Sequence, residues 1–156
     1  MAKVVNARHV GLVVEDLDRM ILFYTQYLNF QIAWKFTIDT AAFREGVGIP
    51  DASARGTHLR VPGSDIQIEM IEYTPKIGRS PEQSLSNCPG FRHMAFVVDD
   101  IDEMFASLQS RGVEFFSQKP ILVTEPPAAN GLKFVYFKDP EGNIIELNQL
   151  PKNWKG

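Results

Sequence analysis

The sequence predicts an α+β fold made of two tandem βαβββ modules. Three observations support this prediction: an internal repeat, an apolar run followed by an Asp-x-Asp pair at the start of each copy, and turn residues between the last two strands of each copy. An apolar fraction of 44% and a formal net charge of −3 at 156 residues are typical of a compact globule rather than of a disordered chain.

The repeat is visible without gaps. Residues 8–20 align with residues 92–104 at a shift of 84, and seven of the thirteen positions are identical, including two of the three histidines of the chain. We therefore interpret residues 1–156 as one domain of two repeats, about 4–73 and 91–149, joined by a linker at 74–90 that is rich in Pro and Gly.

Each copy begins with a strand that leads into a helix. The pairs Asp16-x-Asp18 and Asp100-x-Asp102 predict the helix starts, and Gly112 predicts the end of the second helix. The apolar stripes of the two helices are Leu17, Met20, Ile21, Tyr24, Tyr27 and Leu28 in the first copy, and Ile101, Met104, Phe105 and Leu108 in the second.

Three further strands follow each helix. The predicted ranges are 30–38, 57–61 and 65–73 in the first copy, and 113–116, 133–137 and 143–148 in the second. The last two strands of each copy are joined by the turn segments 62–65 and 139–143. Residues 39–56 are predicted to be a long loop, a candidate lid over a site.

Composition excludes several functional classes. Sixteen basic residues against nineteen acidic ones, without a Lys/Arg run, argue against nucleic acid as a partner. Apolar stretches of about five residues are too short to cross a membrane. The absence of a signal-like start and the single Cys88 favour the cytoplasm, and Cys88 has no basic neighbour that would make it a catalytic thiol.

Two histidines and two glutamates recur at matching places. His9 and His93 lie on the first strands of the copies, and Glu69 and Glu146 lie within apolar last strands, 60 and 53 residues later. One such histidine or glutamate is usually structural, but the doubled set needs a common cause. A divalent metal would compensate two partly buried carboxylates, and the donor set suits Zn²⁺, Ni²⁺, Co²⁺, Mn²⁺ or Fe²⁺.

The third histidine, His58, has two interpretations. Its strand parity allows it to point into the same site as a second proton carrier. An ordinary strand histidine is the more frequent case.

The paired modules, the His-x-x-x-Val openings and the segment 139–147 (DPEGNIIEL) resemble the vicinal oxygen chelate superfamily over about residues 4–150. This superfamily includes glyoxalase I, extradiol dioxygenases and bleomycin resistance proteins. The resemblance implies a cupped, open, barrel-like sheet around one metal ion, held by His9, Glu69, His93 and Glu146. It also implies a homodimer.

Within the superfamily, the His/Glu/His/Glu set is similar to that of glyoxalase I. The resemblance implies a metal-dependent lyase or isomerase for a small substrate with vicinal oxygens, with Glu146 and also Glu69 moving the proton. Val13 stands where glyoxalase I has a basic residue for glutathione, so we do not expect that cosubstrate. The alternatives are an Fe²⁺ extradiol-type dioxygenase and a non-catalytic small-molecule binding or resistance protein.

Overall fold

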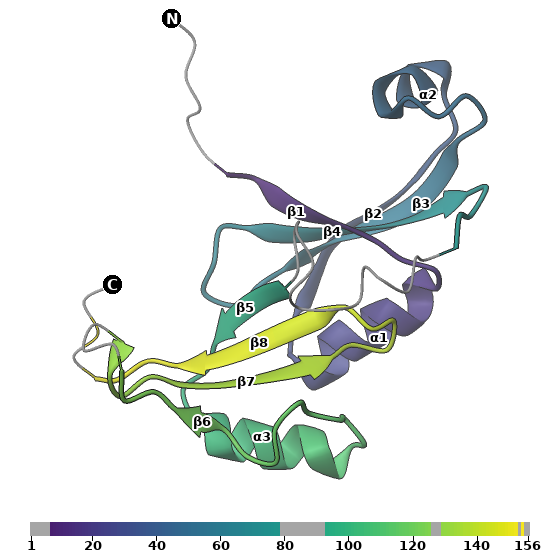
Figure 1. Cartoon of the computed structure of the whole chain (residues 1–156). Helices are drawn as coiled ribbons and strands as arrows, with labels where there is room; N and C mark the ends of the chain where they lie inside the picture. Colours follow the sequence, from purple (N-terminus) through teal and green to yellow (C-terminus); the bar gives the residue numbers. More distant parts are fainter. Residues whose placement is uncertain (1–6, 79–92, 126–128, 153, 155–156) are drawn as a thin grey trace, which may run out of the picture. The chain divides into compact units, whose positions relative to one another are not determined.

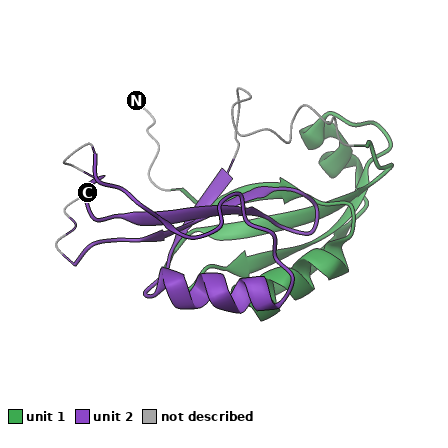
Figure 2. Ribbon diagram, turned by 60° about the horizontal axis from the view of Figure 1, so that its bottom comes forward, with its two compact units in different colours: residues 1–78 green, residues 79–156 purple. Residues whose placement is uncertain are grey.

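The computed structural model describes residues 7–78, 93–125, 129–152 and 154 (Figure 1). By its internal contacts the chain divides into two compact units, Met1–Gly78 and Arg79–Gly156, which Figure 2 shows in separate colours. Cys88 and most of the predicted linker lie outside the described residues.

The first unit contains a four-stranded mixed sheet in the order β1-β4-β3-β2. Its strands are β1 (His9–Val13), β2 (Gln31–Ile38), β3 (Ser53–Arg60) and β4 (Gln67–Thr74). The edge strand β1 pairs in parallel with β4, whereas β3 pairs antiparallel with both β4 and β2. The parallel pair is possible because helix α1 (Leu17–Tyr27) connects β1 to the rest of the sheet.

The second unit repeats this order as β5-β8-β7-β6. Its strands are β5 (His93–Val97), β6 (Ile121–Leu122), β7 (Lys133–Lys138) and β8 (Ile144–Gln149), and α3 (Ile101–Ser110) follows β5. The predicted α+β class and the βαβββ pattern are confirmed. The described strands form two open sheets rather than a closed barrel.

The helices begin where the sequence predicts. Asp16 and Asp100 are the N-caps, and their side chains accept hydrogen bonds from the backbone N–H groups of Arg19 and Glu103. After the C-cap of α3, Gly112 adopts a φ of +84°, in the left-handed region that glycine favours. The predicted signals for the start of α3, Asp100, and for its end, Gly112, are therefore both confirmed.

Helices α1 and α3 each lie along one face of the sheet of their own unit (Figure 2). Alternation along the strands places Ile68 and Met70 of β4 on the helix-facing side of the first unit. Ile145 and Leu147 of β8 take the same side in the second unit. Glu69 and Glu146 have the opposite parity, so the candidate site lies on the sheet face opposite the helix in each unit.

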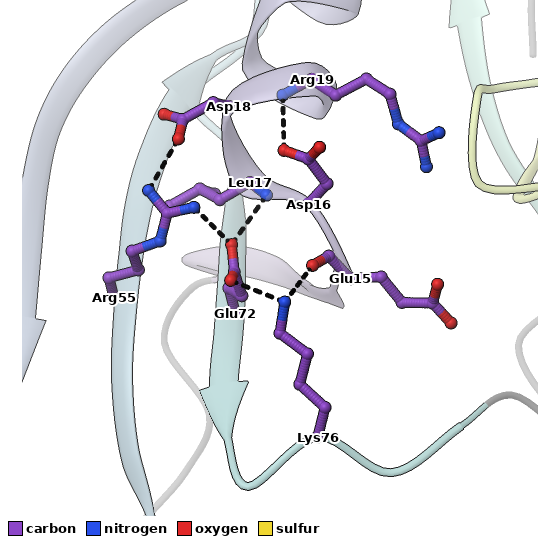
Figure 3. Close-up of polar contacts among 8 residues, drawn as sticks. All are labelled: Glu15, Asp16, Leu17, Asp18, Arg19, Arg55, Glu72 and Lys76. Carbon is purple, nitrogen blue, oxygen red and sulfur yellow. Dashed lines mark hydrogen bonds and ion pairs between the residues drawn. The ribbon is translucent and has the colours of Figure 1, made fainter.

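A polar cluster fixes the start of α1 against the sheet (Figure 3). The backbone N–H of Leu17 donates to Glu72 Oε2 at 2.9 Å, and Arg55 reaches the same oxygen at 2.7 Å. Arg55 also contacts Asp18 at 2.8 Å, and Lys76 contacts Glu72 Oε1 at 2.8 Å. The cluster therefore joins α1, β3 and β4.

Two predicted segments differ in the structure. Residues 39–56 are not an irregular loop, because they contain helix α2 (Ala41–Val47) and the start of β3. Thr40 caps α2, and Gly48 ends it with a φ of +72°. The ring of Phe43 stacks on Tyr73 at 5.9 Å between centroids, so α2 contacts the end of β4.

The predicted strand at 113–116 is also wrong. Phe115 forms only an isolated bridge with Phe137, and the fourth strand of the second sheet is β6 instead. The physical reason is that the Phe115 ring packs against Phe105 at 4.3 Å and Phe137 at 5.4 Å between centroids, which anchors this segment by side-chain packing. Among the described residues, no helix combines the length and apolarity that crossing a membrane requires.

Candidate metal centre

In the first unit, the predicted residues His9 and Glu69 lie together. His9 Nε2 is 3.2 Å from Glu69 Oε2. The register explains the contact: Gly11 of β1 is the neighbour of Glu69 on β4, and His9 precedes Gly11 by two residues on the same face. A Cβ added at Gly11 would meet no atom within 4 Å, so the space beside this position is open.

In the second unit, His93 and Glu146 form the same contact. His93 Nε2 is 3.2 Å from Glu146 Oε2. Ala95 is the neighbour of Glu146 on the paired strand, as Gly11 is of Glu69. Each predicted histidine is thus brought to the glutamate of its own unit, at the same distance and between the same atoms.

A third residue joins Glu69 in the first unit. His58 of β3 is the antiparallel neighbour of Glu69, and its Nε2 lies 2.9 Å from Glu69 Oε1. Its other nitrogen, Nδ1, lies 3.0 Å from Gln67 Oε1. The indole ring of Trp34 stacks on the imidazole at 4.2 Å between centroids. The side chain of His58 is only 2% exposed, compared with 32% for His9.

Among the described residues, His9, His58 and Glu69 form a cluster of possible metal ligands. Their ligand atoms all lie within 4.8 Å of one another. Two atoms that bind one divalent ion, each at about 2.1 Å, are roughly 3 to 3.5 Å apart. The His9–Glu69 and His93–Glu146 contacts both fall in this range. Imidazole nitrogen and carboxylate oxygen are also donors that Zn²⁺, Mn²⁺, Fe²⁺, Co²⁺ and Ni²⁺ accept. The residues therefore fit a divalent metal.

The second unit has a tyrosine beside its glutamate. Tyr136 of β7 is the antiparallel neighbour of Glu146. Burial, followed by a hydrogen bond to Glu146 and the charge of that carboxylate, raises the pKa of Tyr136 to about 12. The phenol consequently stays protonated at neutral pH and donates its hydrogen to Glu146.

A second tyrosine lies on the same strand face as Glu69. Burial and the negative charge of Glu69 raise the pKa of Tyr73 above its ordinary value. This phenol is therefore also neutral at physiological pH. Its stacked partner Phe43 belongs to α2, so α2 borders the strand that carries the glutamate.

Sequence reasoning missed Tyr136 and left His58 undecided. The available signal was strand parity together with the antiparallel register, since both residues lie opposite a predicted ligand. The two positions differ by 78 residues (136 − 58), whereas the histidine motifs differ by 84 (93 − 9). The repeat alignment at one fixed shift therefore did not pair them.

Comparison with known proteins gives a consistent result. Residues 6–147 match the sequence model of the Glyoxalase/Bleomycin resistance protein/Dioxygenase superfamily. A 2-epi-5-epi-valiolone epimerase from an Actinomyces species is 31% identical over 151 residues, covering 94% of this chain and 80% of that protein.

Solved structures share the fold. A glyoxalase family protein from Bacillus cereus has a TM-score of 0.80 at 20% identity, with 96% of each chain covered. A glyoxylase/bleomycin resistance protein/dioxygenase domain from a Frankia species has a TM-score of 0.69 at 20% identity, covering 97% of this chain and 96% of that one.

Proposed function

The chain belongs to the Glyoxalase/Bleomycin resistance protein/Dioxygenase superfamily, and from this premise we propose that it is a divalent-metal-dependent isomerase of the epimerase type. The observation that carries the proposal is the repeated His–Glu contact, 3.2 Å between the same atoms in both units. A relative at 31% identity is named as an epimerase, which supports isomerase rather than lyase chemistry.

In this proposal His9, Glu69, His93 and Glu146 hold one ion. A bound divalent ion would act as a Lewis acid that stabilises negative charge on a substrate oxygen. The substrate class is a small molecule with two adjacent oxygens, such as a hydroxy-carbonyl or dicarbonyl compound.

The proton step belongs to the glutamates. The carboxylate of Glu146 takes the proton from the carbon next to the carbonyl, and the electron pair of the broken C–H bond moves onto the carbonyl oxygen as an enolate; Glu69 is the second carboxylate that can carry a proton there. Return of a proton to the opposite face of that carbon gives the epimer. No electron is gained or lost overall, so the reaction needs no redox partner.

Proton exchange with solvent tests this function. The protein is incubated in D₂O with a panel of α-hydroxyketones, and exchange of the proton next to the carbonyl is followed by NMR. Glu146→Gln should retain metal and lose at least about 100-fold in exchange rate, the range typical of removing a general base. The matched control Glu114→Gln changes an exposed glutamate outside the site and should exchange like the unaltered protein. Full exchange by metal-loaded Glu146→Gln would contradict the assignment of the base.

A second candidate, an Fe²⁺ dioxygenase, is favoured by one observation. His9, His58 and Glu69 have the two-His, one-carboxylate composition used by many iron oxygenases. That function predicts oxygen uptake by the iron-loaded protein with catechol-like compounds. Substrate-dependent oxygen consumption without carbon-bound deuterium exchange would replace the isomerase proposal by this one.

We also propose that the protein forms a homodimer, as its resemblance to the family suggests. Nucleic acid and membranes are not among the partners that we propose. Light scattering of the purified protein should give twice the mass of the chain.

A further inference from the structure

His58 and Tyr136 occupy equivalent places in the two units. His58 is the antiparallel neighbour of Glu69, and Tyr136 is the antiparallel neighbour of Glu146. In sequence order, both lie on the third of the four strands of their unit. The first strand of each unit carries the histidine, and the fourth carries the glutamate. The repeat therefore supplies a third residue to each His–Glu pair, although its identity differs.

The ring geometry repeats as well. The rings of His9 and His58 meet edge to face, with centroids 5.3 Å apart and planes at 81°. Those of His93 and Tyr136 are 5.4 Å apart at 89°. An aromatic ring also stacks on each third residue: Trp34 on His58 at 4.2 Å, and Phe116 on Tyr136 at 6.4 Å. Each third residue therefore has one ring at its edge or face and another stacked on it.

In the first unit the two histidines contact different oxygens of one carboxylate. His9 Nε2 faces Oε2 of Glu69, and His58 Nε2 faces Oε1. A carboxylate oxygen accepts hydrogen bonds, so the tautomer of His58 with a hydrogen on Nε2 donates it to Oε1. Since Nδ1 is engaged with Gln67, both ring nitrogens of His58 are already occupied by side chains of the protein.

We propose that His58 and Tyr136 are positioning residues: His58 holds Oε1 of Glu69 and so directs Oε2, beside His9, toward the metal, and Tyr136, opposite Glu146 on the neighbouring strand, orients that carboxylate beside His93. This role rests on the metal site proposed above. It assigns no direct metal contact to His58, even though His58 belongs to the group of clustered ligand atoms.

The difference between the units is the reason for this assignment. The imidazole of His58 and the phenol of Tyr136 share one property, which is an N–H or O–H group on the residue opposite the glutamate. They do not share metal-ligand chemistry, because neutral imidazole is a common ligand and a protonated phenol is not. Exposure agrees: His9 and His93 are 32% and 42% exposed, whereas His58 is 2% exposed beneath Trp34.

Titration of the full metal-free chain with Co²⁺ tests the role. Partners that orient ligands change metal affinity about 10- to 100-fold when they are removed. His58→Leu and Tyr136→Phe should each bind Co²⁺ about 10- to 100-fold more weakly, with the stoichiometry of the unaltered protein. His58→Gln keeps an N–H donor and should recover most of the lost affinity. Tyr136→Phe removes a single oxygen atom, so it tests the proposal even if His58→Leu does not fold.

X-ray absorption of the Co²⁺-loaded proteins separates positioning from ligation. The number of imidazoles around the metal should be the same in the unaltered protein and in His58→Leu, and one fewer in His9→Ala. Loss of one imidazole in His58→Leu would overturn the positioning role. Unchanged affinity in both His58→Leu and Tyr136→Phe would overturn it too.

The outcome for the unaltered chain separates this inference from the proposed function. Failure of the unaltered protein to bind Co²⁺ would refute the metal site and the positioning role together. Normal binding by the unaltered protein with insensitive variants would refute the positioning role alone. A protein that binds Co²⁺ as expected but exchanges no substrate proton would refute only the proposed reaction.

Discussion

Replacing Glu72 by Gln should weaken the first unit in a pH-dependent way. Burial alone would raise the pKa of Glu72, but hydrogen bonds from Lys76, the Leu17 N–H and Arg55, with the charge of Arg55, outweigh burial and lower it to about 2 from an ordinary 4.5. The ionised carboxylate thus binds more strongly to its neighbours than the protonated form does.

The second unit shows what Glu72→Gln leaves in place. Gln149, three residues after Glu146 as Glu72 is three after Glu69, accepts the backbone N–H of Ile101 at 3.0 Å. A glutamine at position 72 should therefore still accept the N–H of Leu17. What is lost are the negative charge that pairs with Arg55 and the acceptor oxygen that faces Lys76; both cations are exposed. Exposed ion pairs contribute about 0.2–1 kcal/mol each, so we expect a loss of about 0.5–2 kcal/mol at pH 7.

The sign of the pH effect follows from the lowered pKa. The stabilisation by Glu72 is complete above pH 4.5 and is lost as the pH falls toward about 2. The free energies of unfolding of the unaltered protein and Glu72→Gln should accordingly converge in acid. Urea titrations at pH 7 and pH 3 measure this difference, with Glu114→Gln as a control for loss of one exposed negative charge.

Hydrogen exchange locates the effect. Amides of α1, residues 17–27, should exchange faster in Glu72→Gln, while those of α3, residues 101–110, should not change. Equal stability of the two proteins at pH 7, or a difference of the same size at pH 3, would refute the reasoning. Faster exchange in both helices would show that the cluster is not specific to α1.

Three further predictions follow from single contacts. Gly56→Ala should destabilise the protein by about 1–3 kcal/mol in urea titrations, because an added Cβ would lie 2.3 Å from Phe36 Cζ and 2.6 Å from the carbonyl oxygen of Met70; unchanged stability would mean that β2 and β3 separate easily. Asp139→Ala should lower the thermal midpoint and cost about 1.5–3 kcal/mol, because the buried Asp139 accepts hydrogen bonds from Glu141 N, Asn143 N and Asn143 Nδ2 at 2.8–3.0 Å; a midpoint equal to that of the unaltered protein would contradict a structural role for this turn. Removal of metal by a chelator should abolish proton exchange, and Mn²⁺, Co²⁺, Ni²⁺ or Zn²⁺ should restore it; exchange that persists in the chelated protein would refute metal dependence.

Local sequence signals predicted much of the fold. Asp16 and Asp100 act as caps because an Asp side chain accepts the free N–H groups of a first helical turn. The same kind of signal was available for α2, where Thr40 is the N-cap and Gly48 the left-handed end. It was outweighed by the many small residues of this stretch, which also favour loops.

Tertiary contacts decided what the sequence did not predict. Residues 113–116 are rich in residue types that favour strands. The ring of Phe115 instead packs against Phe105 and Phe137 of the second unit. For the site, matching motifs revealed His9 and His93, whereas His58 and Tyr136 became comparable only through the register of their strands. An alignment of the two repeats that relies on identical residues does not find site positions whose residue types differ between the copies.

Metal content per chain tests the central claim most directly. Elemental analysis of the unaltered protein and of His9→Ala and His93→Ala, purified identically, should give about one transition metal per chain and substantial loss in both variants. Loss in His9→Ala with full retention in His93→Ala would mean that the first unit binds the ion alone and would contradict a site shared by the two repeats. Absence of metal from the unaltered protein, even after reconstitution, would contradict the metal-dependent function.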